Sequence, residues 1–173
     1  MTDVLLEVVG LKALARAGWV RAGISDPESV AAHSWGIAWL VLVLLPEELD
    51  LERALAYAAL HDLPEVRTGD VTPHDAVAAV KKHEREGEAM RALCASLGDR
   101  SATLLDLWRR YEEQADEESH FVRQLDRLDM AIQAVAYERT SPAPLREFVE
   151  SAARDIHHPT LLPILAELRR RLR

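Results

Sequence analysis

The chain has 173 residues and a net charge of -8 at pH 7, with 49% hydrophobic and 29% charged residues. This length predicts one domain over residues 1–173, and the composition is that of a folded globular chain. The acidic balance argues against a nucleic-acid partner, because the longest basic run is Arg169 to Arg171. The longest apolar run, Ile37 to Leu45, is too short to span a bilayer, and the acidic start does not resemble a signal peptide. We therefore expect a cytoplasmic protein with no membrane partner.

The hydrophobic residues recur with a helical period, and no segment shows sustained strand-like alternation. The sequence thus predicts an all-α fold, a bundle of about seven or eight helices. A first helix includes Leu5 and Ala15 and could end at Gly18. Asp26 would cap a second helix that begins at Pro27 and ends near Leu45. A third helix is expected to begin near Leu51. The later helices are expected to cover Pro73–Leu97, Ser101–Glu113, Glu117–Glu138, Pro144–Ile156 and Pro159–Leu172.

Polar residues that can bind a metal interrupt two of these apolar patterns. His33 falls on the inward stripe of the second helix, and the adjacent pair His61 and Asp62 closes the apolar face that starts at Leu51. Cys94 is the single cysteine, so a metal would have to rely on His, Asp and Glu. Two imidazoles and two carboxylates suit a divalent cation and leave positions for water and an anionic oxygen.

Each of these residues also has an ordinary explanation. A histidine on an apolar stripe can be a hydrogen-bonded core residue, and His61 with Asp62 can form a helix end. The helix Glu117–Glu138 offers two carboxylates, Asp126 and Asp129, and spacing alone does not choose between them. The face of Asp126 lies next to the apolar row of this helix, which favours Asp126 as the one that reaches an interior site. Either could belong to a charged helix face. Trp35, Trp39 and Trp108 are read as core or interface residues.

Several motifs, in order along almost the whole chain, resemble the 5'-deoxynucleotidase branch of the HD-domain phosphohydrolase superfamily. They are Arg16-Ala17-Gly18-Trp19, Pro27 to Ser34, His61 to Glu65, Gly69 to Pro73, Lys82 to Met90, and Phe121 to Asp126. The resemblance implies an all-helical HD domain that binds one divalent metal ion (Mn, Co, Mg or Zn). It also implies hydrolysis of deoxynucleoside 5'-monophosphates and a homodimer.

The resemblance also implies roles for individual residues. The metal ligands would be His33, His61, Asp62 and Asp126. Glu65 and Asp70 would be the catalytic carboxylates, with Glu65 orienting water or taking its proton.

Substrate binding is assigned to Arg16 and Trp19. Some members carry an arginine directly before this tryptophan, where this chain has Gly18, so Arg16 is the candidate replacement. Arg21 and Lys81 are further candidate cations for the phosphate. In the family that the motifs resemble, the residue before the histidine of the second helix is usually an acid, whereas this chain has Ala32 before His33. Trp19 would stack on the base or form a wall beside the sugar.

Two other classes of function remain open at this point. One is a different HD-type phosphohydrolase that acts on a nucleoside triphosphate, a cyclic nucleotide or an alarmone. The other is a protein without turnover, either a metal- and nucleotide-binding module or a helical interaction protein without metal. The joint presence of Glu65 and Asp70 favours the enzyme.

Overall fold

One long helix, α8, packs against other helices on two of its sides. The computed structural model describes residues 1–72, 79–141 and 143–172, and these contain eight α-helices of seven or more residues and no strand. This confirms the predicted all-α class. The α-helices are α1 (Thr2–Val8), α2 (Ala17–Arg21), α3 (Val30–Leu44), α4 (Leu51–Leu60), α5 (Glu65–Thr68), α6 (Ala79–Cys94), α7 (Ser101–Glu112), α8 (Glu117–Glu138), α9 (Arg146–Asp155) and α10 (Leu162–Arg171).

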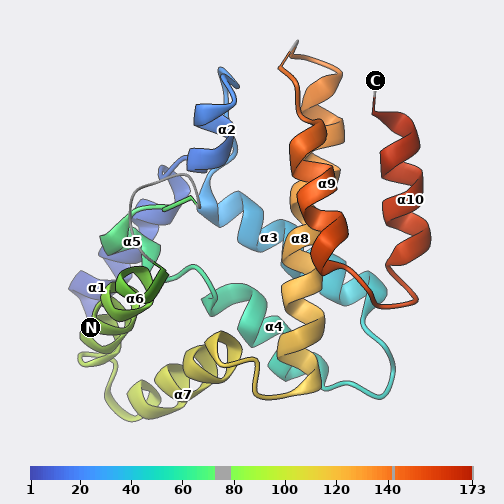
Figure 1. Ribbon diagram of the computed structural model, residues 1–173. Coiled ribbons are helices and arrows are strands. Elements are labelled where there is room, and N and C mark those ends of the chain that lie inside the picture. Colours follow the sequence, from blue (N-terminus) through green and yellow to red (C-terminus); the bar gives the residue numbers. More distant parts are fainter. Residues whose placement is uncertain (73–78, 142, 173) are drawn as a thin grey trace.

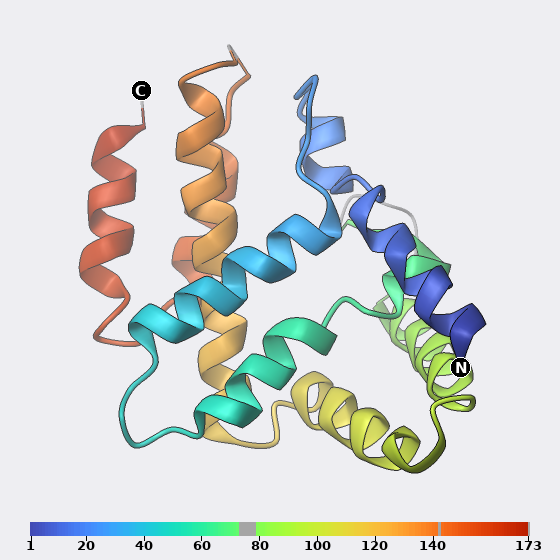
Figure 2. The same cartoon turned by 180° about the vertical axis from the view of Figure 1, so that it is seen from behind.

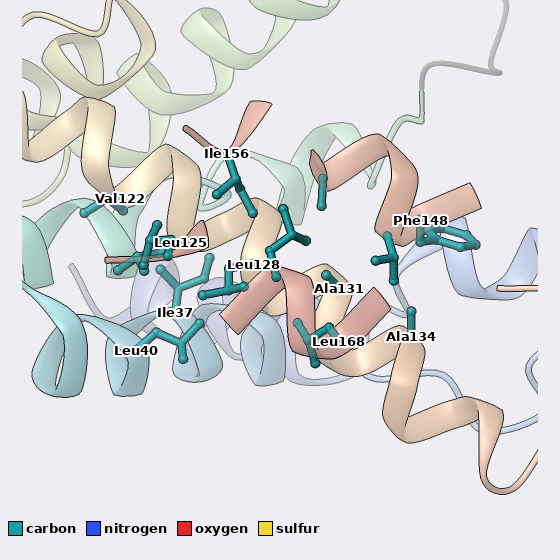
Figure 3. Close-up of a cluster of buried hydrophobic side chains, with 14 of the residues drawn as sticks. Ile37, Leu40, Val122, Leu125, Leu128, Ala131, Ala134, Phe148, Ile156 and Leu168 are labelled. Carbon is teal, nitrogen blue, oxygen red and sulfur yellow. The ribbon is translucent and has the colours of Figure 1, made fainter. Parts of the chain in front are cut away.

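Helix α8 contacts α3 and α4 on one side and α9 and α10 on the other, as Figures 1 and 2 show from opposite directions. Its buried face carries Leu125 and Leu128, which belong to the same main hydrophobic cluster as Ile37 of α3 and Phe148 of α9 (Figure 3). Burial of this apolar surface is the main favourable term that holds the helices together. Residues projecting from α3, α4 and α8 are therefore held in fixed relation to one another.

Side-chain caps set the start of the three helices that later carry the site. Asp50 accepts from the backbone N–H of Arg53 and begins α4, and Asp116 with Ser119 forms a capping box at α8. The expected start of the second helix was wrong. Ser29, not Asp26, is the cap, and α3 begins at Val30.

The first predicted helix was also wrong, because the chain divides there into α1, a 3-10 turn at Val9–Lys12, and α2. The segment between them pairs with the residues before α3. The backbone N–H of Arg16 donates to the Glu28 carbonyl, and that of Val30 donates to the Leu14 carbonyl. These bonds replace helical ones, so Gly18 lies inside α2 and does not end a longer helix.

The tryptophans divide into two groups. Trp108 of α7 is buried in a small cluster with Met90 and Cys94 of α6. Trp35 and Trp39, both on α3, are 71% and 55% exposed. The expected start of α6 at Pro73 lies outside the described residues. None of the described helices has the length and apolar character of a membrane span.

Candidate metal centre

Three helices bring the four predicted ligands to one place. His33 comes from the buried face of α3, His61 and Asp62 from the C-terminal end of α4, and Asp126 from the middle of α8. The Nε2 atom of His33 lies 3.1 Å from Asp126 Oδ1 and 4.0 Å from Asp62 Oδ2. The Nε2 atom of His61 lies 3.1 Å from the same Asp62 oxygen. Within His33, His61 and Asp62, ligand atoms lie within 4.8 Å of one another.

A hydrogen bond orients the His61 ring so that Nε2 faces this cluster. Nδ1 lies 3.0 Å from the Ala58 carbonyl oxygen, which can only accept, so Nδ1 carries the proton and donates. Nε2 is then a lone-pair donor in the neutral ring. It is buried and has no hydrogen-bond partner among the described residues, although Asp62 is near. Two such electron-pair donors, close together but not hydrogen-bonded, fit a shared cation.

Asp126 and Asp129, which spacing could not separate, contact opposite nitrogens of the His33 ring. Asp126 Oδ1 is near Nε2, whereas Asp129 Oδ2 lies 2.8 Å from Nδ1. Asp129 therefore supplies a carboxylate that orients the His33 ring from the side away from the cluster, a role that the sequence did not indicate. The close approach of Asp129 to α3 depends on Gly36, because a Cβ atom at that position would overlap the Asp129 carboxylate.

These carboxylates also control the protonation of His33. Burial and the positive charge of Arg16 disfavour the imidazolium, but the hydrogen bonds to Asp126 and Asp129 outweigh them and raise the pKa of His33 to about 10. For Asp126, burial acts to raise the pKa, yet His33 and Arg127 hold it well below its usual range. In the metal-free protein a proton thus occupies the position that a cation would take.

Glu65 is buried beside this cluster, on the short helix α5. Burial, followed by the negative charges of Asp62 and Asp70, raises its pKa to about 9, against the opposing effects of Lys82 and Arg16. Its Oε1 atom lies 3.8 Å from Lys82 Nζ, and Oε2 has no hydrogen-bond partner among the described residues. Positive charge next to Asp62 would weaken the repulsion and favour the carboxylate form.

Asp70 follows Gly69, whose φ of 75° places it in the left-handed region that glycine tolerates. The Asp70 carboxylate accepts a 2.7 Å hydrogen bond from the backbone N–H of Ala17. Its second neighbour is Arg16 Nη1 at 3.8 Å. The loop after α5 is thereby joined to the start of α2, and both carboxylates expected to act in catalysis lie next to the cluster.

The two predicted substrate-binding residues differ in their surroundings. Arg16 points into the cluster, with Nη1 3.4 Å from Asp62 Oδ2. Trp19 is only 2% exposed. Its indole packs on Phe148 at 4.3 Å between ring centroids, and its Nε1–H donates to Glu28. Trp19 is therefore placed as a wall, and the stacking alternative would need an open ring face.

These residues line a cavity of about 940 Å³ bounded by α2 and by α5 to α9. Among the other predicted cations, Arg21 lies at the cavity and pairs with Glu147, whereas Lys81 is exposed and does not line it. Its neighbour Lys82 does line the cavity, and it also contacts Glu86 at 3.4 Å. The sequence reading missed Lys82 because α6 is mostly polar and its inward face was not evident.

A family profile described as HD domain matches residues 8–166. The chain belongs to the HD domain family. The 5'-deoxynucleotidase HDDC2 of Bos taurus is 39% identical over 167 residues, 94% of this chain and 82% of that protein. The 5'-deoxynucleotidase YGK1 of Saccharomyces cerevisiae is 32% identical over 134 residues, 75% of this chain and 62% of that protein.

Solved structures share the fold over nearly the whole length of this chain. The PH0347 protein of Pyrococcus horikoshii superimposes with a TM-score of 0.82 and 33% identity, covering 99% of both chains. A structure from Magnetospirillum magnetotacticum described as a predicted metal-dependent phosphohydrolase gives a TM-score of 0.78 at 25% identity, covering 99% of this chain and 93% of that one. The fold and family expected from the motifs are thus confirmed.

Proposed function

We propose that this protein is a metal-dependent 5'-deoxynucleotidase, which hydrolyses deoxynucleoside 5'-monophosphates to deoxynucleoside and inorganic phosphate. The observation that carries the proposal is the buried Nε2 atom of His61, oriented by the Ala58 carbonyl toward Asp62 and left without a hydrogen bond among the described residues. Relatives named 5'-deoxynucleotidase, 31–39% identical to this chain over most of its length, support this choice of reaction.

In this proposal His33, His61, Asp62 and Asp126 hold one divalent ion, which is Mn, Co, Mg or Zn. Mixed imidazole and carboxylate ligands suit these borderline and hard cations. A bound ion would neutralise phosphate charge and favour the ionisation of a water molecule. Asp129 and the Ala58 carbonyl fix the two imidazole rings from behind, which preserves the ligand orientation.

Glu65 is proposed to accept the proton of the attacking water as its oxygen bonds to phosphorus. Positive charge at Asp62 would favour the ionised Glu65 that this step requires. As the bond from phosphorus to the 5'-oxygen breaks, that oxygen takes a proton from the carboxylic acid form of Asp70, and exchange with solvent then removes the proton that Glu65 accepted and returns one to Asp70. Asp70 is fixed for this task by the Ala17 N–H.

Positive side chains must complement the phosphate in a protein of net charge -8. Arg16 and Lys82 already pair with carboxylates of the site, and both would turn toward a phosphate that competes with them. Arg123 differs, because no hydrogen bond or ion pair joins it to the described residues. Its guanidinium lies 6.0 Å from the centre of the Tyr111 ring, one helical turn before Asp126. We therefore include Arg123 among the substrate-binding residues.

Trp19 is proposed to bound the sugar-binding part of the cavity. Its indole is fixed on one side by Phe148 and along one edge by Glu28, so it cannot move aside without losing both contacts. A rigid wall can exclude a larger sugar, which is one route to preference for deoxynucleotides. The protein is also proposed to be a homodimer, as the resemblance implies, and cytoplasmic, as the sequence predicts.

The test is phosphate release by protein stripped with a chelator and reloaded separately with Mn, Co, Mg and Zn. Substrates are deoxynucleoside and ribonucleoside monophosphates, deoxynucleoside triphosphates, cyclic nucleotides and an alarmone. We expect release from deoxynucleoside monophosphates alone, and only with metal. Turnover of another nucleotide class without the monophosphates would replace this function by another HD-type reaction. Binding without any turnover would indicate a module that is not an enzyme.

A further inference from the structure

Tyr111 of α7 carries a buried phenol that has no part in the reaction proposed above. The residue is 4% exposed, and it lines the same cavity as Asp62, Glu65 and Asp126. The hydroxyl of a buried tyrosine ordinarily has a hydrogen-bond partner, because an unpaired polar atom inside a protein is costly. The neighbours of this side chain therefore indicate what its hydroxyl binds.

The ring of Tyr111 is held between α4 and α8. Its centre lies 5.7 Å from the centre of the His61 ring, with the two planes at 63°. Tyr57, also on α4, packs at 5.9 Å, and the guanidinium of Arg123 on α8 lies 6.0 Å from the ring centre. Such ring contacts are favourable, and they hold Tyr111 directly beside a proposed metal ligand.

The hydroxyl of Tyr111 has no hydrogen bond to the described part of the chain. The hydrogen bonds of this residue there are those of its backbone, whose carbonyl accepts from Gln114. The neighbouring Tyr57 differs, because its hydroxyl donates a 2.6 Å bond to Asp116. Unlike Nε2 of His61, the Tyr111 oxygen is not fully enclosed by protein, so it opens onto the cavity that the residue lines.

This hydroxyl is suited to donate a hydrogen bond to an anion. A tyrosine with an ordinary pKa of about 10 is protonated at neutral pH. Burial, followed by the negative charges of Asp126 and Asp62, raises the pKa of Tyr111 further. A phosphate oxygen in the cavity would be the acceptor that this O–H lacks, and hydrogen bonds to ionised oxygens are stronger than neutral ones.

The position of Tyr111 favours the phosphate of a nucleotide over its sugar. Trp19, the proposed sugar wall, belongs to α2. Figures 1 and 2 show α2 above and α7 below the C-terminal end of α4, which carries the metal ligands. Tyr111 also lies next to Arg123, which is proposed to bind the phosphate. A nucleotide with its sugar at Trp19 and its phosphate at the end of α4 would direct its outer phosphate oxygens toward Tyr111.

We propose that Tyr111 is a further substrate-binding residue, whose hydroxyl donates a hydrogen bond to a non-bridging phosphate oxygen on the side away from the sugar. The identity of the substrate rests on the proposed function, but the contact requires only a bound phosphate. The hydroxyl adds a donor without adding charge. The packing of the ring on His61 keeps this donor at a fixed position relative to the metal centre.

The first test measures binding of inorganic phosphate to the metal-loaded protein by calorimetry, which needs no turnover. Tyr111→Phe keeps the ring and removes the hydroxyl. Its phosphate affinity should fall about 10–100-fold, as expected for a lost hydrogen bond to a charged group. Tyr57→Phe is the matched control, because it removes another buried tyrosine hydroxyl, and its phosphate affinity should equal that of the parent. Bound metal should be unchanged in both variants.

A second measurement locates the hydroxyl along the substrate. Deoxyadenosine has the sugar and the base without the phosphate, so it should bind the parent and Tyr111→Phe equally. With a deoxynucleoside monophosphate as substrate, the KM of Tyr111→Phe should rise by about the factor by which its phosphate affinity falls, with little change in kcat.

Equal phosphate affinity of the parent and Tyr111→Phe would overturn the proposal, as would an equal loss in Tyr57→Phe or a parent that binds no phosphate. Loss of metal from Tyr111→Phe, or weaker binding of deoxyadenosine, would also overturn it, because the residue would then act on the metal or the nucleoside. Failure of the proposed function is distinguishable. In that case the parent would bind phosphate, Tyr111→Phe would bind it more weakly, and neither would release phosphate from deoxynucleotides.

Discussion

Replacing Glu65 by glutamine should stabilise the metal-free protein at neutral and alkaline pH. Burial and the nearby carboxylates raise the pKa of Glu65 from its ordinary value of 4.5 to about 9. A raised folded-state pKa favours folding below pH 4.5 and loses that advantage as the pH rises toward 9. Glutamine has a similar shape and no charge, so the variant should not show this decline.

The size of the effect follows from the pKa difference. Each pH unit between the unfolded and folded pKa values costs about 1.4 kcal/mol. Ionisation of Glu65 in the unfolded chain therefore lowers the stability of the metal-free parent by about 3 kcal/mol at pH 7, relative to a neutral side chain. No reduction for solvent screening applies, since Glu65 is 2% exposed.

The assay is urea unfolding in the presence of a chelator, at pH 5, 7 and 8.5. The stability of Glu65→Gln relative to the parent should grow with pH. Glu88→Gln, at an exposed position on α6, is the control and should follow the parent. Equal stability of the parent and Glu65→Gln at pH 8.5 would show that burial does not hold Glu65 protonated.

The same substitution should abolish most of the phosphate release. Glutamine cannot accept a proton, and such general-base contributions are on the order of 10²–10⁴-fold. Bound metal, measured in both proteins, should be unchanged because Glu65 is not one of the proposed ligands. A loss of less than about tenfold would remove Glu65 from the proton-transfer step.

Further substitutions test the ligands, their support and the substrate contacts. His61→Ala and Asp62→Ala should each lose the metal and all activity, and near-stoichiometric metal by elemental analysis would place the site elsewhere. Gly36→Ala should weaken metal binding about 10–100-fold by displacing the carboxylate behind His33, whereas Gly87→Ala, whose added Cβ makes ordinary contacts, should not. Arg123→Gln should raise KM about tenfold or more with little change in kcat, as expected for a lost charge-assisted bond to phosphate; an unchanged KM would remove Arg123 from the substrate site.

The elements that the sequence predicted best are long and have clear caps. The bounds of α8 were predicted without error, because Asp116 and the apolar period agree. The region before α3 was not, since its backbone bonds join residues 14–16 to residues 28–30 across a turn. No helical period reports such pairing. The short helices α2 and α5 were not predicted either, because helices of this length are not stable alone and depend on tertiary contacts.

The proposed ligands on α3 and α4 were foreseeable because helix phase fixes the face to which each side chain belongs. His33 lies in register with Ile37 and Val41, so it had to enter the core. Lys82 lies on a helix whose exposed side is rich in charge, so neither phase nor composition separated it from Lys81. Its contact with Glu65 depends on how α6 packs on α5, which is a tertiary property.

Asp126 and Asp129 show what physical information the sequence lacked. Residues three apart on α8 face the same neighbouring helix, so spacing alone did not choose between them, and only the position of Asp126 beside the apolar row favoured it. The distinction arises from the ring of His33, which presents a different nitrogen to each carboxylate. Gly36 makes this arrangement sterically acceptable, because any side chain there would occupy the space of the Asp129 carboxylate. A glycine in the middle of an apolar helix costs stability, and here that cost allows a carboxylate to reach the imidazole from the side away from the proposed cation.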